Sequence, residues 1–259
     1  MTAPAGAPPD IDAPGDGTSP PRSLLSAALI ALAALSVMAV AQLAAIVVET
    51  LISGRILADL ARGTSAPDAQ ALVSLMRVTA LAQAVVIALV GLLATLAGGP
   101  FRRALRLGWP RTGIGAFVVP LAVTLALLVI VNAFVGFVLR HDLLADLELY
   151  RRALASAARG WAIGAIAFGA PVSEELLFRG LLLPALAATR LGFVPAALLT
   201  TAAWTGLHFS YSWLGLAEVA LAGLVFAWAW RRSGSLWVPI VCHAAYNGTI
   251  LLALLLWTT

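Results

Sequence analysis

Residues 23–48 form a run of 26 residues without a single charged side chain. A helix needs about 20 mostly apolar residues to cross a bilayer, so this run is long enough to span one and too long for the core of a typical signal peptide. The remaining chain has a similar character, because 61% of all residues are hydrophobic and only 11% are charged. An ordinary soluble domain is roughly half apolar. The sequence therefore predicts an integral membrane protein.

Further apolar runs predict additional spans. Lipid offers no partners for backbone N–H and C=O groups, and the runs lack the alternating pattern of a barrel, so helices are expected. We predict an all-α bundle of about seven to eight membrane spans. Amphipathic patterns at 101–107 and 141–159 predict one or two helices lying in the membrane interface. The runs after the first one cover residues 78–98, 114–139, 161–188, 191–209, 213–230 and 236–257.

The segments outside these runs suggest how the chain is organised. Residues 1–22 are rich in Pro, Ala, Gly and Asp without an apolar period, which predicts a disordered tail. Residues 23–259 are expected to form one integral membrane domain. The net charge of +4 comes from arginine alone, and arginines in loops and at span ends indicate contact with lipid headgroups, not with nucleic acid. Their distribution weakly favours a cytoplasmic amino terminus. We expect a multi-pass protein of the cell membrane.

Three charged side chains lie close together inside the run at 161–188. Glu175 and Arg179 are four residues apart, so they share a helix face and can form an ion pair. Glu174 is rotated about 100° away and lacks that partner. Pro171 interrupts the backbone ladder just before them. Because charged groups at mid-bilayer normally pair, face a wet cavity or do chemistry, we predict a polar cavity around Glu174.

Two more pairs at four-residue spacing follow in the next spans, Trp204 with His208 and His243 with Asn247. A carboxylate and an imidazole can polarise a water molecule, while His and Asn donors can stabilise an oxyanion. Together with Glu174, these groups are suited to the hydrolysis of a peptide bond.

The depth of these groups can be estimated by counting along ideal helices. Glu174 and His208 lie 16 and 18 residues from Arg190, which is near a predicted turn, so they are nearly level. His243 lies only nine residues after Gly234 at the following turn. It would need a tilted or broken helix to join them.

Taken in order, the three motifs resemble those of the CAAX prenyl endopeptidase type II and bacteriocin-processing family, CPBP, also known as the abortive-infection family. The resemblance covers about residues 161–257 and implies a glutamate-dependent intramembrane endopeptidase. It implies a peptide or lipidated protein substrate that enters from the membrane or the cytoplasmic face. The motifs read Glu174-Glu175-x-x-x-Arg179, Trp204-x-x-x-His208 and His243-x-x-x-Asn247.

The resemblance also implies a role for each residue. Glu174 and His208 would activate the attacking water, and His243 and Asn247 would form the oxyanion hole. The ion pair of the second glutamate with arginine would hold the site together. Trp204 stands where the family more often has phenylalanine, which changes the volume of the pocket.

Zinc is the alternative to a metal-free mechanism, with Glu174, His208 and His243 as its ligands. We prefer no metal, because the chain has no His-Glu-x-x-His pair and the three ligands would come from three helices. Cys242 is the only cysteine, which excludes an internal disulfide and a cysteine-based metal cluster.

Other functions fit the same polar groups less well. A non-catalytic scaffold or immunity-type member, or a proton-coupled transporter, could also place charges inside a bundle. Among the remaining polar side chains, Glu218 is near enough to a span end to reach the headgroups. Gln42, Gln83 and Asn132 are expected to form hydrogen bonds between helices.

Overall fold

The computed structural model describes residues 23–54, 68–96 and 101–257. In these ranges every regular element is a helix, which confirms the predicted all-α class. The predicted tail at 1–22 lies outside the described residues. In chain order, the elements are α1 (Leu24–Ser53), α3 (Ala69–Leu96), α4 (Phe101–Ala104), α5 (Gly115–Phe137), η2 (Leu143–Leu147), α6 (Glu148–Leu154), α7 (Arg159–Ile163), η3 (Gly164–Gly169), α8 (Ala170–Glu175), η4 (Leu176–Leu182), α9 (Leu183–Ala187), α10 (Phe193–Gly206), α11 (Trp213–Ser233) and α12 (Trp237–Trp257).

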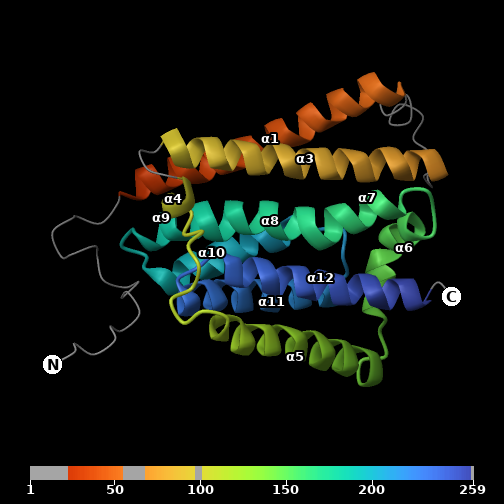
Figure 1. Ribbon diagram of the computed structural model, residues 1–259. Coiled ribbons are helices and arrows are strands. Elements are labelled where there is room, and N and C mark those ends of the chain that lie inside the picture. Colours follow the sequence, from red (N-terminus) through yellow and green to blue (C-terminus); the bar gives the residue numbers. More distant parts are fainter. Residues whose placement is uncertain (1–22, 55–67, 97–100, 258–259) are drawn as a thin grey trace.

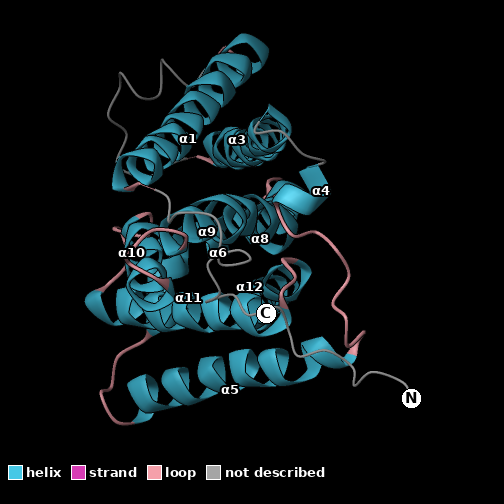
Figure 2. Cartoon of the chain, turned by 90° about the vertical axis from the view of Figure 1, so that its left-hand side faces the viewer, coloured by secondary structure: helices cyan, strands magenta, loops and turns pink. Residues whose placement is uncertain are grey.

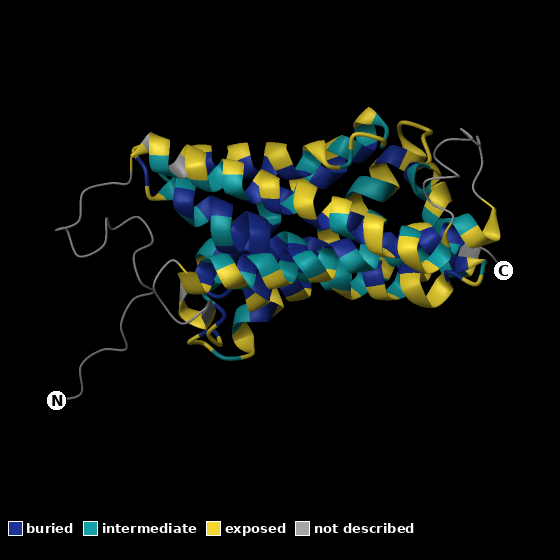
Figure 3. Cartoon of the chain, turned by 90° about the horizontal axis from the view of Figure 1, so that it is seen from above, coloured by how far each residue is buried: buried dark blue, intermediate teal, exposed yellow. Residues whose placement is uncertain are grey.

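Six helices in the described part of the chain are long and apolar enough to cross a membrane. They are α1, α3, α5, α11, α12 and a continuous helix at Arg159–Ala187, here called the central helix, which comprises α7, η3, α8, η4 and α9. Large apolar side chains are exposed along them, as expected of surfaces that face lipid. Figure 3 shows exposed residues along the outer faces of the helices. The protein is therefore a multi-pass integral membrane protein.

The remaining predicted span, at 191–209, corresponds to the shorter helix α10. It has 14 residues, or about 21 Å at 1.5 Å per residue, which is less than the thickness of the hydrocarbon core. The helix ends at Gly206, and the chain then turns, with the His208 N–H donating to the Thr205 carbonyl and the Tyr211 N–H to the His208 carbonyl. His208 therefore lies in this turn and not within a span.

The helices are arranged in layers around the central helix (Figures 1 and 2). The hairpin of α1 and α3 packs on one side of it, and α12 packs on the other. Helix α10 contacts α9 and α11, and α5 lies outermost against α11 and α12. The central helix is thus covered on both sides, which explains how it can carry buried charges.

Capping residues set the ends of several helices. Ser23 and Ser212 accept backbone N–H bonds at the first turns of α1 and α11. Gly54 and Gly234 close the same two helices in the left-handed conformation, with φ of 67° and 65°. The sharp turn at Gly234 lets α12 return directly alongside α11.

Two segments of the central helix are wound as π-helix. In η3 the N–H of Ala170 donates to the carbonyl of Ala165, and at the end of η4 Leu183 donates to Phe178, each five residues back. Each segment leads to a proline, Pro171 or Pro184. Proline has no N–H and its ring clashes with the preceding turn, so a wider turn accommodates it. Segments of this kind often occur at functional sites.

The start of α12 explains how His243 reaches the acidic pair. Leu236, just before α12, packs against Gly180, which lies ten residues before Arg190 in the sequence. The helix therefore starts deeper than the turn near Arg190, and His243 comes level with Glu175 without a break in α12. Of the two conditions that the sequence analysis gave, a tilted or a broken helix, the break is not present.

The amphipathic segments form short helices. Segment 101–107 begins with α4, and segment 141–159 contains η2 and α6, whose Leu143 and Leu154 are buried. Their position in the membrane interface stays a prediction.

Candidate active site

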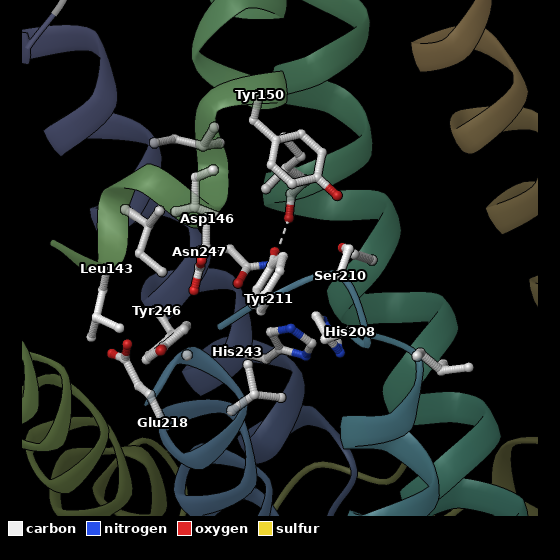
Figure 4. Close-up of a pocket in the computed structure, with 18 of the residues that line it drawn as sticks. Leu143, Asp146, Tyr150, His208, Ser210, Tyr211, Glu218, His243, Tyr246 and Asn247 are labelled. Carbon is white, nitrogen blue, oxygen red and sulfur yellow. Dashed lines mark hydrogen bonds between the residues drawn. The ribbon is translucent and has the colours of Figure 1, made fainter. Parts of the chain in front are cut away.

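A cavity of about 260 Å³ lies between the central helix, α3, α11, α12 and the η2–α6 segment (Figure 4). It is lined by most of the polar residues that the sequence singled out. These are Glu174, Trp204, His208, His243 and Asn247.

The Glu175–Arg179 ion pair lies directly behind this cavity. Arg179 Nη1 is 2.9 Å from Glu175 Oε1, and both side chains are at most 1% exposed. The guanidinium also donates to the Gly223 carbonyl at 3.0 Å and lies over the Trp204 ring, 4.7 Å from its centroid. The predicted pair is present, and it links the central helix to α10 and α11.

Glu174 faces the cavity, as its rotation from Glu175 predicted. Its side chain keeps 23% of its exposure, and its Oε2 accepts a hydrogen bond from the indole N–H of Trp204. The same oxygen is 4.0 Å from Nε2 of His243. This carboxylate has one protein donor and open space in front of it.

His243 lies between the two acids. Its Nδ1 is 3.0 Å from Oε1 of Glu175, and its ring stacks on Phe226 with centroids 4.9 Å apart. Because a carboxylate can only accept, this contact assigns the proton to Nδ1. In the neutral ring Nε2 is then an acceptor that faces Glu174. A water molecule between them can donate one hydrogen to each, which leaves a lone pair free for attack.

His208 lies in the turn after α10 and lines the cavity near His243 (Figure 4). Its Nδ1 lies 3.2 Å from the carbonyl oxygen of Trp204, and its ring meets the Trp204 ring edge-on at 5.3 Å. The i, i+4 pairing expected from the sequence is therefore present, although the helix ends between the two residues.

Asn247 lines the cavity and also forms a hydrogen bond with the backbone of the central helix. Its Nδ2 donates to the carbonyl of Ile166 at 2.8 Å (Figure 4). In the π pattern of η3, the donor for this carbonyl would be residue 171, which is a proline and has no N–H. Asn247 therefore supplies the hydrogen bond that Pro171 cannot, and its second N–H stays available to the cavity.

Several cavity residues were missed by the sequence analysis. Glu218 is 7% exposed and accepts a hydrogen bond from Asn132 at 2.7 Å, with Tyr246 as a second partner. The prediction that it reaches the headgroups was wrong, because it faces inward from the second turn of α11. The hydrogen bond predicted for Asn132 is confirmed. A polar residue near a span end gives no sign of which way it faces.

All three tyrosines of the chain, Tyr150, Tyr211 and Tyr246, line this cavity. The hydroxyls of Tyr150 and Tyr211 are within hydrogen-bonding reach of each other. Burial raises the pKa of both phenols, and the negative charge of Glu174 adds to this. Both therefore stay protonated at neutral pH and can act as hydrogen-bond donors. The sequence shows that tyrosine is rare in this chain, but only the fold shows that the three tyrosines lie together.

The residues do not fit the zinc alternative. Within the described ranges no group of three His, Cys, Asp or Glu side chains has a geometry that could hold a metal. We therefore derive no step through a metal ion.

Gly223 offers a test of how tightly this region is packed. A Cβ atom at this position would lie 2.8 Å from Cγ2 of Thr201 and 2.9 Å from Cε3 of Trp204. We expect Gly223→Ala to lower the free energy of unfolding by about 1–3 kcal/mol, measured by thermal or chemical denaturation in detergent. Gly91→Ala is the control, because nothing lies within 4 Å of its added Cβ. Equal stability of both variants would contradict the packing.

The helices that carry most of this site match a known family. Residues 156–249 match the family model described as Type II CAAX prenyl endopeptidase Rce1-like. This part of the chain is thus similar to the type II CAAX prenyl endopeptidases, the family that the sequence motifs resemble. The matched region contains all three sequence motifs. Comparisons with curated proteins and with solved structures gave no match.

The match supports a general activity. The matched family is one of CAAX-type intramembrane proteases, which supports a protease-type hydrolase. The matched region includes the central helix, α10, α11 and most of α12. Helices α1, α3 and α5 lie outside it.

Proposed function

We propose that this protein is a glutamate-dependent intramembrane endopeptidase that hydrolyses a peptide bond with water activated by Glu174. The observation that carries the proposal is the 4.0 Å separation between Oε2 of Glu174 and Nε2 of His243. A water molecule hydrogen-bonded to both atoms fits this distance, since each bond needs about 2.7–2.8 Å. Glu174 takes the proton of this water as it attacks the scissile carbonyl.

His243 holds the water and is itself held by Glu175. The carboxylate of Glu175, paired with Arg179, fixes the orientation of the imidazole through Nδ1. As in other acid–histidine pairs, the buried acid sets the tautomer of the imidazole. It also changes the roles implied by the resemblance, which gave water activation to His208.

His208 and Asn247 then act on the substrate. The free N–H of Asn247 can donate to the oxyanion that forms on the carbonyl carbon. His208 can donate to the same oxygen or pass a proton to the departing amine. Both side chains line the same cavity as Glu174, which supports these roles.

The substrate follows from the membrane setting of the site. We propose a peptide or lipidated protein that enters from the bilayer or from the cytoplasmic face, with the enzyme in the cell membrane. Residues 23–259 would serve as one membrane domain around the site.

The experiment is a cleavage assay with the purified protein in lipid nanodiscs. Paired peptide libraries, S-prenylated and unmodified, are incubated with it, and mass spectrometry identifies the cut bonds. We expect endoproteolytic cleavage with one ¹⁸O from labelled water in the new carboxylate. Proton flux in proteoliposomes with no cleavage would instead indicate a transporter, and neither activity would indicate a scaffold.

A further inference from the structure

Gln83 on α3 reaches the candidate active site from outside the region that matches the CPBP family. It lines the same cavity as Glu174, and α3 packs along the η3 and α8 parts of the central helix. The sequence predicted a hydrogen bond between helices for this side chain. That prediction was wrong, because its Oε1 is buried without any hydrogen-bond partner.

The position of this carboxamide depends on Gly169, the last residue of η3. A Cβ atom on Gly169 would lie 2.0 Å from Oε1 of Gln83, so only glycine permits the amide to lie there. Gly169 is five residues before Glu174. The amide is therefore held next to the backbone of the helix that carries the candidate base.

The lack of a partner is costly. A buried acceptor without a donor destabilises a protein by about 1–3 kcal/mol, and an apolar side chain of similar size would avoid this cost. Thr79, the neighbouring polar residue on the same face of α3, does have a hydrogen-bond partner, because its hydroxyl donates to the Leu75 carbonyl of its own helix. Among the described residues, no acceptor is hydrogen-bonded to the Gln83 amide nitrogen either. Gln83 thus has unused capacity for both kinds of hydrogen bond, inside the cavity.

We propose that the Gln83 carboxamide binds the main chain of the peptide substrate. A carboxamide carries a donor and an acceptor, which matches the C=O and N–H of a peptide unit. An extended peptide taken out of water into a membrane protein needs such partners for its backbone. Gln83 has no charge, so it is suited to hold a substrate and not to act as a base. The inference rests on the proposed endopeptidase function and adds a substrate-binding residue from α3.

The first test is Gln83→Leu, with Gln42→Leu as the control. Gln42 lies on an exposed face of α1. We expect Gln83→Leu to raise KM about tenfold with kcat changed by less than about twofold, because the lost contact stabilises the bound substrate and the transition state equally. We also expect its melting temperature to stay equal or rise, because a buried unpaired acceptor is removed. A fall in melting temperature with unchanged KM would show a structural role and overturn the inference.

The second test measures binding without turnover. In the Glu174→Gln background, the Kd of a fluorescent S-farnesylated peptide and of its unmodified counterpart is measured in nanodiscs, with and without Gln83→Leu. We expect about tenfold weaker binding with Gln83→Leu, and a smaller difference once the contacted peptide bond is replaced by an ester, which lacks the N–H but keeps the C=O. Equal Kd values for the two variants would overturn the inference. Peptide binding without cleavage by wild type would count against the proposed function alone, and no binding at all against both.

Discussion

Glu174→Gln is expected to lower kcat by about 10²–10⁴-fold, the range typical of a lost general base. The glutamine has the same shape, and its amide oxygen can still accept the indole N–H of Trp204. It cannot take a proton from the water held near His243. The measurement is cleavage of the peptide found in the library assay, under saturating substrate.

The control for this variant is Glu148→Gln. Glu148 is an exposed acid of α6 that pairs with Arg151 away from the cavity. The Glu148→Gln variant should leave kcat unchanged, and both variants should bind the peptide as wild type does. Full activity of Glu174→Gln would contradict the proposed mechanism.

Arg179→Met is expected to lower the free energy of unfolding by about 3–5 kcal/mol, because it leaves the carboxylate of Glu175 buried without its partner. Arg179 also donates to the Gly223 carbonyl and lies over Trp204, so packing is lost as well. Denaturation of the protein in detergent, followed by tryptophan fluorescence, measures this loss.

The double variant Glu175→Gln/Arg179→Met separates stability from activity. Without either charge, most of the lost stability should return, because replacing both members of a buried ion pair with uncharged side chains often changes stability little. Activity should stay reduced, by about 10²-fold, because His243 no longer has a carboxylate to orient it. If the double variant were as unstable as Arg179→Met, the loss of the ion pair would not explain the lower free energy of unfolding of Arg179→Met. If it were fully active, His243 would not need Glu175.

The helical class and the approximate positions of the spans followed from composition and from the lengths of the apolar runs. The main error was in α10, where the apolar run at 191–209 continues past Gly206 although the helix does not. Hydrophobicity measures how readily a segment enters an apolar environment, but it does not show where backbone hydrogen bonds stop. The turn at His208 depends on those bonds.

The candidate site could be assembled in part from spacing. The Glu175–Arg179 pair and the rotation of Glu174 away from it follow from helix geometry alone. The approach of His243 does not, because it depends on where α12 starts relative to the central helix, which Leu236 and Gly180 determine. Contacts between distant segments are not encoded in local periodicity.

The contributions of Glu218 and Gln83 were harder to foresee for a related reason. In a membrane helix, a polar residue can face lipid headgroups, a neighbouring helix or a cavity, and the sequence pattern around it is apolar in every case. Only the packing of α3 against the central helix, and of α11 against α5 and α12, decides which way these two side chains point.

The two π-helical segments have a consequence for how this chain can change over evolution. A π turn holds one residue more than an α turn over the same rotation, so losing a single residue from η3 would restore ordinary winding and leave the segments beyond it facing as before. The α turn of α8 has no extra residue to lose, so a deletion there, before Glu174, would rotate Glu174 by about 100° and take it out of the cavity. Deletion of one codon is therefore expected to be tolerated better in η3 than in α8, where it would silence the enzyme.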